Sequence, residues 1–263
     1  MRKSSVFWGI VVILAGLLLL LNSFGVLDYS VWKVFWPAFL ILLGLWFLLI
    51  PVFRKNDPVT NQHITFQVED TSESEVIFRH GAGRLNVDAA TVNDSLLEVD
   101  FSGEVEQKII RSGNLAKIQL SAKEESFIPL RPGSGLIWNV RLNRFVIYRL
   151  AFRTGASESM INLSDLQVKE VSLETGASSS TVTMPARAGR TRVEVKFGAA
   201  SVNLIVPEGV AAHIKVESGL SGININTNRF PVVENGYESP DYAIAENRVD
   251  ILVESGLGSL SIQ

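Results

Sequence analysis

The chain has 263 residues and no cysteine, which excludes disulfides, zinc–thiolate sites and cysteine nucleophiles. Its charge is unevenly distributed. Residues 1–55 hold five of the 24 lysines and arginines but only one of the 27 acids, so the rest of the chain carries 19 bases against 26 acids. An acidic surface does not suit contacts with phosphates, and this composition therefore argues against a nucleic-acid-binding protein.

The first 55 residues contain two long apolar runs. The first begins with VFWGIVVILAGLLLLL at Val6 and continues to Leu27, and the second extends from Val34 to Phe53. Each is long enough for the bilayer core, which needs about 20 apolar residues in helical form. The segment NSFGVLDYS between them has the composition of a tight turn. The sequence therefore predicts a transmembrane hairpin over residues 1–55, with helices at 6–27 and 34–53.

Positive charges set the expected orientation of this hairpin. Arg2 and Lys3 precede the first run, Arg54 and Lys55 follow the second, and only Lys33 lies between them. The positive-inside rule then predicts that both termini lie in the cytoplasm. With two spans, the chain would be a multi-pass protein of the cell membrane, in contact with membrane lipid. A cleaved signal peptide is the alternative interpretation of the N-terminus. The first run is too long for a signal-peptide core and no A-x-A-type site follows it, so we expect the hairpin to remain uncleaved.

Residues 56–64 are predicted to form a linker, and from residue 65 to residue 263 the pattern changes to an alternation of apolar and polar residues. Period-two segments such as VSLE (171–174) and VEVK (193–196) are typical of strands that are buried on one face. The alternation recurs together with a glycine, as in FRHGAGRLNV (78–87), FRTGASESMINL (152–163), LETGASSSTVTM (173–184), VKFGAASVNLIV (195–206), VESGLSGININ (216–226) and VESGLGSLSI (253–262). We call these residues the corner glycines: Gly81, Gly155, Gly176, Gly198, Gly219 and Gly256.

The spacing of the corner glycines indicates a structural repeat. From Gly155 the successive gaps are 21, 22 and 21 residues, and a longer gap of 37 residues before Gly256 is consistent with an insertion at 230–247. A fixed short period is typical of stacked architectures, in which neighbouring units bury each other's faces. Each glycine is expected at a corner with a positive φ or a close backbone neighbour. We predict that residues 65–263 form an all-β domain, a β-solenoid of stacked short strands; a β-sandwich is the alternative.

Both parts of the chain resemble known bacterial families. The segment GIVVILAGLLLLLNSFGVLDYSVWKVFWPAFLILLGLWFLL is similar to the LiaI/LiaF-type transmembrane region of envelope-stress proteins. The segments ETGASSSTVTMP and FGAASVNLIVPEGVAAHIKVESGLSGI resemble the toast-rack domains attached to such regions. The resemblance implies a membrane-anchored regulatory or scaffolding protein of the cell-envelope stress response. Its partner would be a signalling protein such as a sensor kinase, which members of this family hold inactive. The prototype has four spans, whereas two are predicted here.

The sequence offers no candidate for catalysis. His63, His80 and His213 are far apart and lie in no metal-binding motif, and no G-x-S-x-G elbow is present. We therefore predict no catalytic, cofactor-binding or metal-binding residue and no enzyme. The alternative to a regulatory protein is a binding module for an envelope lipid or peptide.

One segment is unusually basic. Residues 126–157 contain no acid, and in VIYRLAFR (146–153) the alternation places Arg149 and Arg153 on one face of a strand. These arginines could pair with the many glutamates of the domain, or they could contact an acidic partner or anionic lipid headgroups. The candidate contact residues are Arg131, Arg141, Arg144, Arg149 and Arg153.

Overall fold

A computed structural model describes residues 36–37, 39–41, 43–44, 61–91, 94–122 and 136–263. The chain divides into two compact units, Met1–Pro58 and Val59–Gln263, which we describe separately. In the first unit the described residues between 36 and 44 are helical. The predicted span at 6–27, and the remainder of the span at 34–53, lie outside the described residues. Within the part that the structure describes, no helical segment reaches the length and hydropathy that a bilayer span requires.

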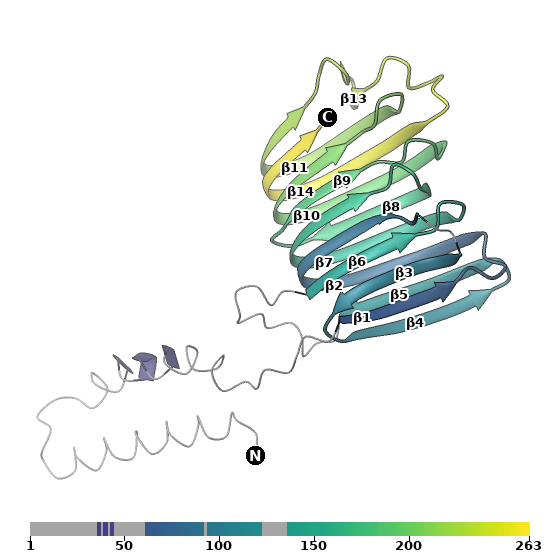
Figure 1. Cartoon of the computed structure of the whole chain (residues 1–263). Helices are drawn as coiled ribbons and strands as arrows, with labels where there is room; N and C mark the ends of the chain where they lie inside the picture. The colour runs from purple at the N-terminus through teal and green to yellow at the C-terminus, as the bar shows by residue number, and fades with distance from the viewer. Residues whose placement is uncertain (1–35, 38, 42, 45–60, 92–93, 123–135) are drawn as a thin grey trace, which may run out of the picture. The chain divides into compact units, whose positions relative to one another are not determined.

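The second unit is built from long strands that each bend near the middle and stack on one another (Figure 1). The bend divides every long strand into a half before its corner and a half after it. We call the two resulting layers the first layer and the second layer. The long strands are β2 (Glu73–Ala89), β7 (Ile147–Asn162), β10 (Arg190–Ile205), β11 (Ala211–Ile225) and β14 (Arg248–Ile262).

Shorter strands complete the stack. Two pairs of them take the place of a long strand: β5 (Leu115–Ala122) with β6 (Leu136–Leu142), and β8 (Gln167–Thr175) with β9 (Ser179–Thr183). In both layers the stacked strands run parallel from β2 through to β11. Antiparallel strands pair at the two ends: β1 (Asn61–Gln67), β3 (Ser95–Ser102) and β4 (Val105–Ser112) at one, and β12 (Val232–Val233) and β13 (Gly236–Glu238) at the other.

The hydrophobic core lies between the two layers, because alternate side chains of the stacked long strands point inward. In the first layer of β7, Tyr148, Leu150 and Phe152 are all buried. Phe152 stacks on Phe78 of β2, with ring centroids 5.2 Å apart. The Tyr148 hydroxyl donates a hydrogen bond of 2.8 Å to the Leu96 carbonyl, which satisfies the only polar atom of this buried side chain. The period-two pattern predicted for this domain therefore matches its burial.

The register confirms the predicted repeat and corrects its order at one end. Thr154 of β7 lies beside Thr175 of β8, and Thr175 lies beside Phe197 of β10, which are offsets of 21 and 22 residues. Gly219, however, does not follow Gly198 in the stack. After β11 the chain makes an excursion and returns as β14, which inserts between β10 and β11. Gly256 is therefore the neighbour of Gly198, and β11 is the outermost of the parallel strands.

Close packing of backbones, rather than a positive φ, explains the corner glycines. None of the six has a positive φ. A Cβ on Gly155 would lie 2.4 Å from the carbonyl oxygen of Gly81, and a Cβ on Gly256 would lie 2.8 Å from that of Gly198. At these two corners a side chain would separate the strands, whereas a Cβ on Gly198 would lie 3.5 Å from the carbonyl oxygen of Gly176. Positive φ occurs elsewhere, for example at Gly258 (φ +133).

Candidate functional site: a charged groove along the corners

An open groove of about 1520 Å³ runs along the row of corners and crosses strands of the first layer from β4 to β11. Its floor is formed by corner glycines, which have no side chain to fill the space. Its walls are formed by the residues one and two positions before each glycine, such as His80 and Arg79 before Gly81. The same stacking of backbones that requires glycine therefore also creates a long trough at the edge of the domain.

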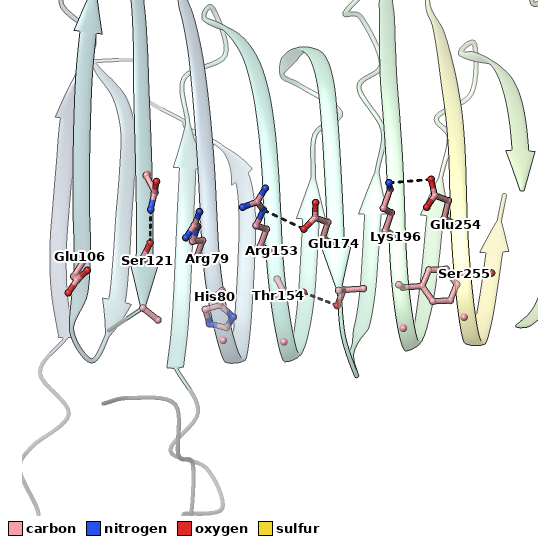
Figure 2. Close-up of a pocket in the computed structure, with 18 of the residues that line it drawn as sticks. Arg79, His80, Glu106, Ser121, Arg153, Thr154, Glu174, Lys196, Glu254 and Ser255 are labelled. Carbon is pink, nitrogen blue, oxygen red and sulfur yellow. Dashed lines mark hydrogen bonds and ion pairs between the residues drawn. The ribbon is translucent and has the colours of Figure 1, made fainter. Parts of the chain in front are cut away.

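The residues two positions before the corner glycines form a continuous row of mostly charged side chains on the outer face of the first layer (Figure 2). The strand register places one member of the row on each strand, side by side with the next. We call this set the charge row. In spatial order it consists of Glu106 and Ser121, which continue the row at the paired positions of β4 and β5, and then Arg79, Arg153, Glu174, Lys196, Glu254 and Glu217.

Most charges of the row are balanced by a neighbour. Arg153 lies 3.4 Å from Glu174, and Lys196 lies 3.2 Å from Glu254. Arg79 differs, because its guanidinium forms no ion pair or hydrogen bond within the described part of the chain and lies beside the like charge of Arg153. Like charges on directly neighbouring positions destabilise a sheet. Among the described residues, the guanidinium of Arg79 is therefore a positive charge without a partner where β2 meets β7.

His80 forms part of the inner wall of the groove next to Arg79. Its side chain is fully buried and lies edge-on to Trp138, with ring centroids 5.2 Å apart. The Nε2 atom lies 3.2 Å from the Leu136 carbonyl, to which it donates its proton, whereas Nδ1 has no hydrogen-bond partner among the described residues. Burial lowers the pKa of His80, and the hydrogen bond to Leu136 offsets this only in part. The site thus favours neutral histidine.

The arginines singled out from the sequence are distributed over the domain rather than gathered in one patch. Arg141 lies on the second layer, Arg144 lies in the turn before β7, and Arg149 and Arg153 share the outer face of the first layer, as the alternation predicts. Of the four described candidates, Arg153 alone lines the groove, and Arg131 lies outside the described residues. Each of the other four has a carboxylate nearby: Arg141 with Glu98 at 3.1 Å and Asp100 at 2.7 Å, Arg144 with Asp165 at 3.5 Å, Arg149 with Glu73 at 3.3 Å, and Arg153 with Glu174 at 3.4 Å.

Sequence reasoning missed Arg79, although the repeat contains a signal for it. Arg79 stands two residues before Gly81, as Arg153 stands two residues before Gly155. Aligning the segments FRHG and FRTG column by column, instead of searching for local clusters of one charge, would have placed the two arginines side by side. Within the described residues, no group of histidines and acids is arranged to hold a metal ion. His63 and His213 instead contact Asp100 and Glu238, at 2.6 and 2.8 Å.

Comparison with known families identifies the β domain. Residues 55–205, more than half of the chain, match the family model described as the N-terminal domain of toast_rack, DUF2154. The chain belongs to the toast-rack family. Residues 6–48 match the LiaI-LiaF-like transmembrane region, so this toast-rack protein is membrane-associated. Both matches confirm the resemblance stated from the sequence, and both families are structural or regulatory rather than catalytic.

A solved structure supports the same fold. A candidate cell-adhesion protein from Clostridium sporogenes is 19% identical to the toast-rack chain and superposes with a TM-score of 0.72. The match covers 78% of this chain and 99% of the other. A candidate adhesin from Bacteroides fragilis is 8% identical over 79% of this chain and 98% of its own, and its TM-score of 0.32 is too low to indicate a shared fold. No curated protein sequence matches the chain.

Proposed function

We propose that this toast-rack protein is a non-enzymatic regulatory or scaffolding protein of the bacterial cell-envelope stress response. Two N-terminal spans anchor it in the cell membrane as a multi-pass protein, with both termini and the β domain in the cytoplasm. The β domain contacts a signalling partner, for which a membrane sensor kinase is the best candidate. The matches to the toast-rack and LiaI-LiaF-like families support this assignment.

The contact is proposed to lie along the charge row, and the charge of Arg79, which has no ion-pair partner among the described residues, carries this part of the proposal. Stacked strands hold the backbone of the row rigidly, so a partner that binds there orders side chains but no main-chain segment. A partner with a carboxylate opposite Arg79 and Arg153 would relieve the repulsion between these two cations. Such an arrangement favours recognition of an acidic protein surface.

Charge reversal in the groove tests this function. We expect the double variant Arg79→Glu/Arg153→Glu, in a strain that lacks the native gene, to alter an envelope-stress reporter under antibiotic challenge as strongly as deletion does. The control is Arg84→Glu, which breaks the exposed pair with Glu158 (2.9 Å) on the second layer and lies outside the groove. A reporter that responds like wild type to the groove variant would contradict the proposed contact site. A reporter that does not respond to deletion of the gene would contradict the regulatory role.

A further inference from the structure

The stack ends at β11 without a covering strand over most of its length. β13 pairs only with His213 and Ile214 of β11, so from Lys215 to Ile225 the described residues provide β14 on one side and no strand on the other. The main-chain donors and acceptors along this edge are therefore available for pairing. At the opposite end, the antiparallel strand β4 covers β5 and carries the charged residues Glu106, Lys108 and Arg111.

The rows of side chains that form the core continue to this uncovered end of the stack. Ile223 belongs to a row whose other members are fully buried, yet its own side chain is 40% exposed because no strand lies beyond it. Leu220 is 83% exposed beside Leu257 at the last two corners, where earlier coils have alanine. The buried members of the Ile223 row are Leu85, Ser159, Ser180, Val202 and Leu260.

From Ser218 on, this edge also lacks the features that normally prevent strand association. Natural edge strands are protected by charges, prolines or bulges. The segment SGLSGINI (218–225) contains no charge and no proline. An uncharged apolar edge of this kind is suited to being covered by another strand.

We infer that this end of the stack is an interface with a second copy of the same chain. The chain beyond the hairpin carries 19 bases and 26 acids, so two copies repel each other across most of their surfaces. The part of β11 from Ser218 to Ile225 carries no charge and avoids that repulsion. A two-fold axis through it brings like edges together in antiparallel orientation, satisfies their main-chain groups and covers Ile223 and Leu220 of both copies. The strand stacking that joins the coils within one molecule then continues across the contact into the second molecule.

Single-cysteine cross-linking of the purified full-length protein tests this interface, because the native chain has no cysteine. We expect Asn224→Cys and Leu220→Cys to give covalent dimers with a short bis-maleimide. Ser112→Cys, on the exposed strand β4 at the other end, should remain monomeric under the same conditions. Adding Ile223→Lys to Asn224→Cys places two like charges across the two-fold axis and should abolish the dimer, whereas adding Ile110→Lys, on exposed β4, should not.

The cross-linking yields decide the outcome independently of the groove and its partner. Dimers through residue 224 that disappear with Ile223→Lys support the inference. Equal yields at residues 112 and 224, no yield at either, or a dimer through residue 224 that persists in the presence of Ile223→Lys would overturn it. Circular dichroism of each variant confirms that the β structure is retained, since all substituted positions are exposed in one copy.

Discussion

The variant Gly258→Val is expected to lower the free energy of unfolding by about 2–5 kcal/mol, from a left-handed backbone that disfavours a Cβ and from a clash in a packed region. Gly258 has a φ of +133, and a Cβ built on it would lie 1.9 Å from the carbonyl oxygen of Ala200 on the neighbouring strand. Because β14 lies between β10 and β11, relief of this clash would disturb the ladders on both sides. Thermal or denaturant melts of the full-length protein in detergent measure the loss.

Gly198→Val is the matched control for this prediction. Gly198 has no positive φ, and a Cβ on it would lie 3.5 Å from the Gly176 carbonyl oxygen, an ordinary contact distance. We expect a clearly smaller loss of stability than at Gly258. The exposed Glu217→Ala, which removes only a surface ion pair with Lys215, should change stability by less than about 0.5 kcal/mol. Equal losses for the two glycine variants would contradict the backbone packing described for Gly258 and Gly198.

The second large effect is expected on acidification, through His80. Because burial lowers the pKa of His80 in the folded protein, the unfolded chain takes up this proton at a higher pH than the folded chain does. The free energy of unfolding should therefore fall as the pH drops below about 6.5, by up to about 1.4 kcal/mol per pH unit. The loss should end once the pH reaches the lowered pKa of the folded state.

The variant His80→Phe isolates this effect. Phe197 stands directly before Gly198, as His80 stands directly before Gly81, and its side chain is buried. This position of the repeat therefore accommodates a phenyl ring. Melting temperatures of wild type and variant at pH 7 and pH 5 give the comparison. Over this range the carboxylates with lowered pKa, such as Glu73 and Glu98, remain ionised and contribute little. If the melting temperature of the wild type falls between pH 7 and pH 5 by no more than that of His80→Phe, protonation of His80 is not the cause.

The sequence predicts the stacked architecture well because one physical requirement recurs in it. Parallel strands in fixed register bring equivalent residues of each coil side by side, so glycines 21 or 22 residues apart, such as Gly155, Gly176 and Gly198, must meet. The order of the last two coils could not be predicted in the same way. The insertion before Gly256 indicates only that the last coil comes later in the sequence. Whether the returning strand lies beyond β11 or between β10 and β11 depends on tertiary packing.

The candidate site is less visible in the sequence than the fold. Period two correctly places Arg149 and Arg153 on one face. The groove itself joins residues from strands far apart in the chain, such as Glu106 and Glu217, and no local pattern links them. The acidic partners of the predicted arginines are distant for the same reason: Glu73, for example, is 76 residues away from Arg149. Charge clusters along a chain therefore overestimate how basic a folded surface is.

Photo-cross-linking in living cells tests the proposed partner contact most directly. A photoreactive amino acid at Glu106, an exposed residue in the groove, is expected to cross-link the full-length protein to a membrane signalling protein. The same probe at Ser201, an exposed residue on the outer face of the second layer, is expected to give no such product. The product at Glu106 should disappear when Arg79→Glu/Arg153→Glu is added. Identical products from the two probe positions, or a product at Glu106 that survives the charge reversal, would contradict a partner bound along the charge row.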